Sequence, residues 1–379
     1  FKSETDTEAL VQLVGFLYRN IDKTTVSDAL LSAVCGALRE VKGTFGIAVL
    51  CADEPGKIIA ARRGSPLLIG IGNGENLIAS DGSAVIEHTS RVVYLKDNEV
   101  AIVNTEGLVI STIDEMSMRN EVHVEQLELS LEQIERGGYT HYMLKEIHEQ
   151  PEAIRNTLRG RIDPSHLRVN LGGLDGINSS PSGLRRIVIA GCGTAWHASL
   201  VGKYLIEEIA RVPTDIEYSS ELRYRNAIVD EGTVAFFISQ SGETADTIAA
   251  MSEMRAKGAT VLGIVNVVGS SLSRETEAGI YLHAGPEIGV ASTKAFTAQV
   301  AVLALIAVHL GRQRHLSPDQ CIAILKELNN SPQAIESVLL ADQTIKKLVS
   351  RHINRENWLY LGRGVNYPVA LEGALKLKE

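Results

Sequence analysis

The segment Thr233-Val-Ala-Phe-Phe-Ile-Ser-Gln-Ser-Gly-Glu-Thr244 carries the pattern on which the fold prediction rests. Its apolar run Thr233–Ile238 predicts a buried strand, and a helix is expected directly after the glycine turn, from Thr244 to about Lys257. The same order of strand, glycine turn and helix occurs at Arg186–Ala190 and Ala195–Ile209. Such alternation predicts a parallel, flavodoxin-like sheet with helices on both faces and ligands beyond the carboxyl ends of its strands. Two further strands are predicted at Thr260–Asn266 and Ile280–His283.

The first part of the chain has a different pattern. Two helices are predicted, at Thr5–Asn20 and about Val26–Val41, because apolar residues recur there at helical spacing. Short apolar or alternating runs separated by Gly, Asp, Asn and Pro then predict antiparallel strands. These runs are Phe45–Cys51, Ile58–Ala61, Leu67–Ile71, Leu77–Ala79, Val92–Leu95 and Val100–Val103. An α+β region is therefore expected over residues 1–110.

The rest of the chain divides by composition. Residues 111–182 read as a linker with helices, including Tyr142–Leu158, and its last part is rich in Gly, Ser and Pro. The α/β domain is expected at 183–320 and a helical connection at 321–356. Leu359–Val365 repeats the strand and Gly-x-Gly pattern of Ile187–Thr194, so a second copy of the α/β domain is expected at 357–379. Both ends look cut, since the chain starts at Phe1 and stops within a predicted helix.

Composition excludes several classes of function. The 379 residues carry a net charge of −9 without a basic run, which disfavours a nucleic-acid-binding surface. The longest strongly apolar stretch, Val300–Leu310, is shorter than the ~20 residues that span a bilayer, so a buried helix and no membrane contact are expected. The four cysteines are scattered without a CxxC pair, which predicts neither zinc nor disulfides and favours a reducing, cytoplasmic compartment. No metal and no cofactor are expected.

The loop Ser239–Thr244 is the strongest candidate for ligand binding. Ser239, Ser241 and Thr244 place three hydroxyls around Gly242 where a helix begins. Backbone N–H groups and the helix dipole favour an anion at such a position, and hydroxyls add donors without charge, so a phosphate monoester fits. The alternative is that Ser241 or Thr244 only caps the helix.

The turn Gly191-Cys-Gly-Thr194 follows the first strand of the same sheet. A dinucleotide site would need a third glycine where Trp196 stands, so that interpretation is weak. Cys192 could be a nucleophile, but no base lies near it in the sequence, and a small buried cysteine in a tight turn is favoured. The Thr194 hydroxyl is placed to meet a ligand at the strand ends.

The segment Glu287-Ile-Gly-Val-Ala-Ser-Thr-Lys294 lies between the last predicted strand and the long apolar helix. Gly289 would let the backbone approach a ligand closely. The alternative is a helix start capped by Ser292 or Thr293. The sequence alone leaves the two interpretations even.

Together these three loops resemble the sugar-isomerase (SIS) domain and, more narrowly, the isomerising glutamine–fructose-6-phosphate aminotransferases. The resemblance covers the whole chain, because further segments match in the family's order. They are Ser3-Glu-Thr-Asp-Thr-Glu8, Arg63-Gly-Ser-Pro66, Tyr142–Pro151 and Leu371–Glu379. The resemblance implies synthesis of glucosamine 6-phosphate and glutamate from fructose 6-phosphate and glutamine, the first step of hexosamine synthesis. It also implies a homodimer through the SIS domains.

The resemblance also implies roles for particular residues. Residues 1–110 would be the C-terminal part of a class II glutaminase domain, whose terminal cysteine nucleophile is replaced here by Phe1. Without that cysteine we expect no glutamine hydrolysis by this chain. Asp6 matches the carboxylate that holds the glutamine α-amino group, although by itself it reads as an ordinary acid at a helix start.

The family's sugar site falls on nine positions of this sequence. They are Cys192, Gly193, Thr194, Ser239, Gln240, Ser241, Thr244, Val290 and Ser292. Ala195 stands where the family often has Ser, which removes one possible contact. Glu379 matches the base that moves a proton between C1 and C2, and Lys376 matches a cation that steadies the developing charge. The alternative for both is a solvated surface position, since a Lys-x-Lys-Glu helix end is usually solvated. The family's ring-opening Lys and His would lie beyond Glu379.

Two other functions would share the sugar-phosphate loops. A non-catalytic SIS-domain regulator would carry an output domain such as a basic helix-turn-helix, and the first 110 residues lack that pattern. A simple sugar-phosphate isomerase would not need the glutaminase-like segment. The amidotransferase-isomerase is therefore the preferred hypothesis.

Overall fold

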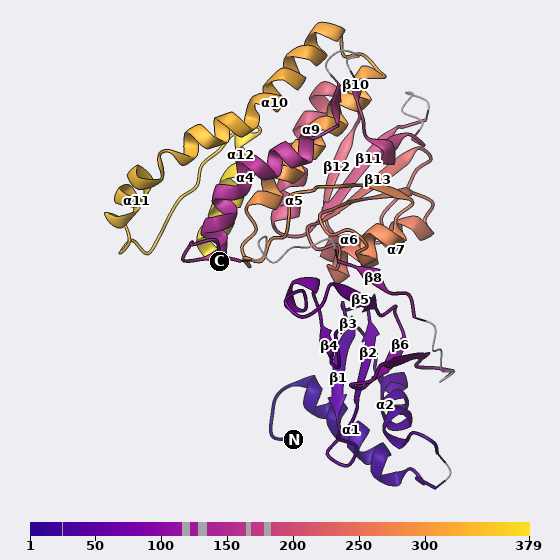
Figure 1. The fold of residues 1–379 in the computed structure, drawn as a ribbon. Helices are drawn as coiled ribbons and strands as arrows, with labels where there is room; N and C mark the ends of the chain where they lie inside the picture. Colours follow the sequence, from indigo (N-terminus) through magenta and orange to yellow (C-terminus); the bar gives the residue numbers. More distant parts are fainter. Residues whose placement is uncertain (25, 116–121, 128–134, 164–167, 178–182) are drawn as a thin grey trace. The chain divides into compact units, whose positions relative to one another are not determined.

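The computed structural model describes residues 1–24, 26–115, 122–127, 135–163, 168–177 and 183–379. The chain folds as two compact units, Phe1–Glu135 and Arg136–Glu379 (Figure 1). Each unit has hydrophobic cores of its own.

In its described residues, the first unit contains two helices and two four-stranded sheets. The helices are α1 (Asp6–Asn20) and α2 (Ala29–Glu40). One sheet has the order β1 (Phe45–Leu50), β2 (Ile58–Arg63), β6 (Glu99–Val103), β7 (Leu108–Thr112). The other has the order β4 (Asn76–Ala79), β3 (Leu68–Ile71), β5 (Arg91–Tyr94), β8 (Glu125–Gln126), and a short 3-10 helix, η1 (Gly82–Ala84), precedes β5. All the strand pairs are antiparallel, which confirms the prediction for this region.

Alternation along β2 explains the layers of this unit. Ile59 and Ala61 belong to the core that includes α1 and α2, whereas Ala60, between them, belongs to the core shared with Ile69 of the other sheet. Successive side chains of a strand point to opposite faces, so one strand contributes to both cores. The unit is a layer of helices on a sheet that packs on a second sheet.

Two strands of the first unit were not predicted. β7 continues from β6 through a tight turn in which Asn104 N–H donates to the Gly107 carbonyl at 3.0 Å, so it crosses the boundary expected at residue 110. β8 contains two polar residues, too few to give a strand pattern. The boundary expected between residues 110 and 111 stays a prediction.

The second unit is built on a five-stranded parallel sheet, which confirms the α/β prediction. Its order is β12 (Thr214–Tyr218), β11 (Arg186–Gly191), β13 (Thr233–Ser239), β14 (Thr260–Val265), β15 (Ala278–Tyr281). This is the flavodoxin-like order. β13 is buried throughout, as a central parallel strand should be. Sequence reasoning missed β12 because this edge strand carries Asp215 and Glu217 and lacks an apolar run.

Helices cover both faces of this sheet (Figure 1). The helices and small elements of this part are α4 (Tyr142–Leu158), α5 (Thr194–Ile209), α6 (Ser219–Leu222), α7 (Ala245–Ala256), α8 (Ser271–Glu275), α9 (Lys294–Arg312), β9 (Ile162–Asp163), β10 (Arg168–Val169) and η2 (Gly172–Leu174). Ile187 and Ile189 of β11 pack in a core with α4, α5 and α9, whereas Val188 and Ala190 pack in the opposite core with α7.

α9 is the one described helix whose length and apolar composition would suffice to cross a membrane. Of the most apolar 18-residue stretch of this helix, 78% is buried, as in the core helix of a globular domain.

The chain ends in three helices. α10 (Pro318–Leu339) starts with a capping box between Ser317 and Gln320, and α11 (Asp342–Ser350) and α12 (Asn366–Lys378) follow. The strand predicted at Leu359–Leu361 does not form, and Leu359 is 90% exposed. A parallel strand needs a neighbour to pair with, and none lies beside this segment in the described part of the chain. The helix predicted after Gly362 is present as α12, and the second domain copy stays a prediction.

Candidate functional site

The predicted ligand loops follow the carboxyl ends of the parallel strands. The turn at Cys192 follows β11, and the hydroxyl loop at Ser239 follows β13, which pairs with β11 through Ala190 and Phe237. The strand order reverses between β11 and β13, because β12 lies on the far side of β11. Crevices at such a switch point are where open α/β sheets bind ligands, so the topology places the two loops at the expected position.

The structure brings the three hydroxyls of the second loop together. Ser239 Oγ lies 2.9 Å from Thr244 Oγ1 and 3.5 Å from Ser241 Oγ. Two backbone amides turn into the same loop, since Gly242 N–H donates to Ser239 Oγ at 3.0 Å and Glu243 N–H donates to Ser241 Oγ at 3.1 Å. The loop is compact and its hydroxyls converge at the start of α7.

The alternative role of these hydroxyls, as helix caps, is not what the structure shows. Thr244 is the N-cap residue of α7, but among the described residues its side chain makes no capping hydrogen bond. Ser241 Oγ accepts from Glu243, which precedes the helix. Asp246, the acid in the first turn of α7, is paired with Arg223 at 2.7 Å. The hydroxyls of Ser239, Ser241 and Thr244 therefore lie at the positive, N-terminal end of α7 without capping the helix.

Gly242 fixes the shape of this loop. Its φ of +68° lies in the left-handed region, and an added Cβ would lie 2.1 Å from Ser270 Oγ. A side chain here would strain the backbone and collide with Ser270. The glycine between the hydroxyls is thus required by the turn itself.

The segment after β15 is held by a carboxylate. Glu287 Oε1 accepts from the N–H groups of Thr293 (2.8 Å) and Ala295 (3.2 Å), so Glu287 caps α9. Its Oε2 accepts from Ser292 Oγ at 2.8 Å. Burial and the nearby Glu146 raise the pKa of Glu287, and the three hydrogen bonds only partly offset this. Capping by Ser292 or Thr293, the alternative considered from the sequence, is wrong, because Glu287 fills that role.

Asn266 joins this segment to the hydroxyl loop. Its N–H donates to the Gln240 carbonyl at 3.1 Å, while its side chain donates to the Gly285 carbonyl at 2.7 Å and accepts from Ala284 N–H at 2.9 Å. Through Asn266, the backbone of Gln240, which precedes Ser241, is therefore linked to the loop that leads to Val290. Val290 itself is 99% exposed at the tip of that loop.

The Cys-Gly-Thr turn meets α12 through side chains. Thr194 Oγ1 donates to Glu372 Oε1 at 2.9 Å and accepts from Lys376 Nζ at 3.1 Å. Lys376 Nζ also lies 3.7 Å from Glu379 Oε2. Lys376 is mostly buried, so it does not lie on a solvated helix end as the alternative proposed. The structure thus places Lys376 beside Thr194, the residue that starts α5, whereas Glu379 is exposed and contacts Lys376.

Glu372 was not identified from the sequence. It is buried, and its Oε2 lies 2.7 Å from His197 Nδ1. Burial alone would raise the pKa of Glu372, but the His197 contact, the charge on Lys376 and the Thr194 hydroxyl together hold it below its usual value. One signal was available, because Glu372 and Lys376 are four residues apart on a predicted helix and so share one face.

Three other predicted residues have plain surroundings. Cys192 is half-buried, so the expectation of a buried turn cysteine is wrong in degree. Ala195 is buried in the first turn of α5, two residues after Gly193, the N-cap residue of that helix. Asp6 is the exposed first residue of α1, in the other unit, and the structure tests no role for it.

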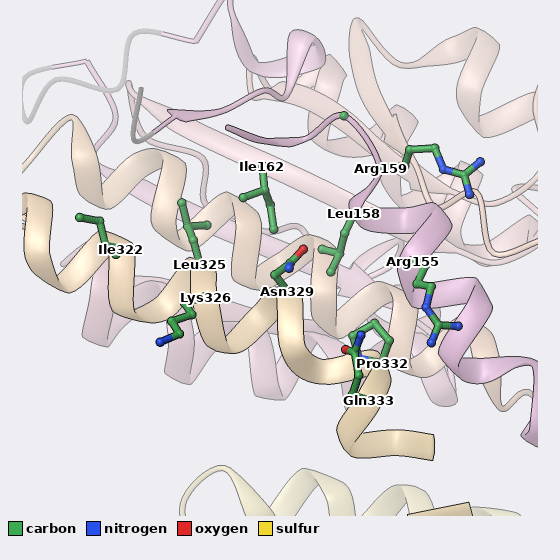
Figure 2. A pocket seen from close by; sticks show the side chains of 11 residues that line it. Arg155, Leu158, Arg159, Ile162, Ile322, Leu325, Lys326, Asn329, Pro332 and Gln333 are labelled. Carbon is green, nitrogen blue, oxygen red and sulfur yellow. The ribbon is translucent and has the colours of Figure 1, made fainter. Parts of the chain in front are cut away.

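A cavity of about 720 Å³ lies between α4 and α10, away from these loops in the sequence. Figure 2 shows apolar side chains such as Leu158, Ile162 and Leu325 with the cations of Arg155 and Lys326 around it. The described residues that line it include no member of the predicted sugar site. All four cysteines are free thiols, and in the described ranges no group of three or more His, Cys, Asp or Glu is placed to hold a metal ion.

Comparison with known proteins relates the α/β part of the chain to a known family. The SIS domain family matches residues 182–309, which contain the Cys-Gly-Thr turn, the hydroxyl loop and the segment after β15. A solved C-terminal domain of glucosamine-fructose-6-phosphate aminotransferase from Francisella tularensis is similar, with a TM-score of 0.60 and 39% identity over 65% of this chain and 68% of that one. A putative phosphosugar isomerase from Silicibacter pomeroyi, with a TM-score of 0.52 and 22% identity, shares the fold over 62% of this chain and 68% of that one.

Curated relatives match the chain from end to end. A glutamine–fructose-6-phosphate aminotransferase [isomerizing] from Chlorobaculum tepidum is 49% identical over 379 residues, and one from Bacteroides thetaiotaomicron is 47% identical over 380 residues. Both alignments cover 100% of this chain and 61% of the relative. The chain therefore spans less than two thirds of the length of these relatives.

Proposed function

The chain belongs to the isomerising glutamine–fructose-6-phosphate aminotransferases, and from this premise we propose that the protein makes glucosamine 6-phosphate and glutamate from fructose 6-phosphate and glutamine. The carrying observation is the convergence of Ser239, Ser241 and Thr244 at the start of α7. Hydroxyl donors at the positive end of a helix suit a phosphate monoester. The relatives' names favour this synthesis over a non-catalytic sugar-phosphate regulator.

The sugar lies, in this proposal, between the hydroxyl loop and α12. The phosphate binds at Ser239, Gln240, Ser241 and Thr244, remote from the reacting carbons, and its binding energy orients the open chain. The sugar body meets Cys192, Gly193, Thr194, Val290 and Ser292. The bridge that Asn266 makes between Gln240 and the segment after β15 supports a single site for these residues.

The proposed reaction needs one group that carries a proton from C1 to C2 of the sugar. Ammonia from glutamine adds to the C2 carbonyl of the open-chain sugar, and water leaves to give an imine at C2. Glu379 then takes a proton from C1 and returns it to C2, while the proton of the C1 hydroxyl passes to the imine nitrogen, so that C1 becomes the aldehyde carbon and C2 carries the amine. Lys376 steadies the negative charge that develops between these steps. The contacts of Lys376 with Thr194 and Glu379 support these roles.

The domain assignment and the assembly belong to the proposal. Residues 1–110 are assigned to the C-terminal part of the glutaminase domain, with Asp6 at the glutamine α-amino group, and residues 357–379 to the start of a second SIS domain. The helix layer on two antiparallel sheets is consistent with the first assignment. The proposed protein is a cytoplasmic homodimer that associates through its SIS domains and uses no cofactor.

Assay of the full-length protein, meaning this chain within a protein of its relatives' length, tests the function. Incubation with fructose 6-phosphate and glutamine should yield glucosamine 6-phosphate and glutamate in equal amounts. Glutamate release without any amino sugar, in the presence of saturating fructose 6-phosphate, would contradict the proposal.

A further inference from the structure

Glu146 makes contacts that the proposed reaction does not use. It lies on α4, which precedes the parallel sheet in the chain, and it is 2% exposed. Its Oε1 accepts from the N–H groups of Ile288 at 2.6 Å and Gly289 at 3.0 Å. A carboxylate from α4 therefore fixes the main chain directly before Val290.

The same segment is held at its other end by Glu287, which caps α9 and accepts from Ser292 Oγ. Between these two anchors, Val290 stands free at the tip. The loop between β15 and α9 is thus shaped by two carboxylates, Glu146 on α4 and Glu287 in the loop itself. The loop carries two predicted sugar contacts, the exposed Val290 and the anchored Ser292.

The packing at Gly289 shows how closely α4 approaches this loop. An added Cβ at Gly289 would lie 2.6 Å from Glu146 Oε2 and 3.3 Å from Met143 N. From the sequence, Gly289 was expected to let the backbone approach a ligand closely, whereas in the structure it lets α4 approach closely. Glu146 can approach the backbone at position 289 because glycine has no side chain there.

A buried carboxylate at position 146 would be energetically unfavourable if its only role were to fill space in the core. Its Oε2 is buried and has no hydrogen-bond partner among the described residues. Burying a carboxylate without full hydrogen bonding is unfavourable, and an apolar residue of similar size would pack at lower cost. Nearby, Lys294 Nζ lies 2.6 Å from Glu149 Oε2 and Lys145 Nζ lies 3.4 Å from Glu149 Oε1, so both cations are engaged with Glu149. What the carboxylate of Glu146 provides is its two hydrogen bonds with the main-chain N–H groups of Ile288 and Gly289.

We propose that Glu146 is a positioning residue for the sugar site, whose carboxylate sets the main chain at Ile288 and Gly289 so that Val290 and Ser292 meet the sugar. This role rests on the proposed function. It requires the acceptor oxygen of Glu146 more than its charge, since the two donors are neutral backbone amides.

Two substitutions and one control separate this role from general packing. Glu146→Gln keeps an acceptor oxygen at nearly the same volume, and Glu146→Leu removes it. Glu152→Leu is the matched control, because Glu152 lies on the same helix, is largely exposed and contacts Arg155 and Arg159 instead of the loop. All three are made in the full-length protein.

The first readout needs no sugar. Amide hydrogen exchange over residues 287–293 should be faster in Glu146→Leu than in the wild type, because the N–H groups of Ile288 and Gly289 lose their acceptor. Glu146→Gln and Glu152→Leu should exchange like the wild type. Unchanged exchange in Glu146→Leu would overturn the proposal, whatever the protein catalyses.

The second readout is kinetic. Glu146→Leu should raise the KM for fructose 6-phosphate by about ten- to a hundred-fold, the effect of losing one well-placed hydrogen bond to a bound ligand, with a much smaller change in kcat. Glu146→Gln should restore most of the affinity, which a merely structural role for the charge would not. Wild-type KM in Glu146→Leu, or equal loss in both variants, would overturn the proposal. A wild type that makes no amino sugar would instead overturn the proposed function, and the exchange result would still report on the contact.

Discussion

His197 Nδ1 lies 2.7 Å from Glu372 Oε2, although 175 positions separate the two residues. The contact joins α5, which starts at the Cys-Gly-Thr turn, to α12 near the end of the chain. Because Lys376 and Glu379 follow Glu372 at one and two turns along the chain, this contact sets where both of them lie relative to Thr194.

Removing the charge of Glu372 should weaken the docking of α12. The pKa of this carboxyl is held below its ordinary value of 4.5. A group whose pKa is lowered by folding stabilises the folded state above its ordinary pKa, and that stability is lost as the pH falls through the folded pKa. Glu372→Gln should therefore lower the free energy of unfolding by roughly 1–3 kcal/mol at neutral pH. Thermal unfolding of both proteins across pH measures this.

The pH dependence of this stability difference serves as a control for the role of the charge. The difference between the wild type and Glu372→Gln should be constant from neutral pH down to about 4.5 and should shrink below it. A difference that stayed the same at the lowest pH would show that the amide disturbs packing and that the charge of Glu372 contributes nothing.

Cys192 should act as a contact residue and not as a nucleophile. It is a half-buried free thiol, and serine is close to it in size and hydrogen-bonding capacity. The full-length Cys192→Ser protein should keep its synthase rate within roughly a factor of three of the wild type. Complete loss of turnover with unchanged binding of fructose 6-phosphate would assign covalent chemistry to this thiol.

Gly242→Ala should damage the hydroxyl loop more than a glycine turn elsewhere. Both Gly242 (φ +68°) and Gly258 (φ +92°) have left-handed backbones, but an added Cβ collides with Ser270 only at Gly242, whereas nothing lies within 4 Å at Gly258. Gly258→Ala measures the backbone strain, about 1 kcal/mol, and Gly242→Ala should cost about 1–3 kcal/mol more and weaken fructose 6-phosphate binding. Equal destabilisation of the two variants would show that the loop yields to the new methyl group.

The sheet was predictable because its central strands are apolar runs bounded by glycine and serine turns. β11, β13 and β14 have such runs, whereas the charged edge strand β12 does not and was missed. The strand expected at Leu359–Leu361 has the same apolar character as β11 but no partner beside it in the described residues, so composition alone misled there.

The hydroxyl loop was predictable because its residues are adjacent in the sequence. The contacts of Glu372 with His197 and of Glu146 with Gly289 were not, because each joins segments that only the fold brings together. Capping of α9 by Glu287 was missed for a related reason, since Ser292 and Thr293 are commoner capping residues.

The phosphate site is tested most directly by comparing two sugars on one variant. Losing one hydrogen bond to a charged group costs about 1.5–3 kcal/mol, so Ser241→Ala in the full-length protein should weaken fructose 6-phosphate binding by about ten- to a hundred-fold. Binding of unphosphorylated fructose, already weak, should barely change, whereas a misfolded loop would harm both sugars alike. Titration of both sugars against the wild type and the variant gives the four affinities needed. An unchanged affinity of Ser241→Ala for fructose 6-phosphate would contradict a phosphate site at the start of α7.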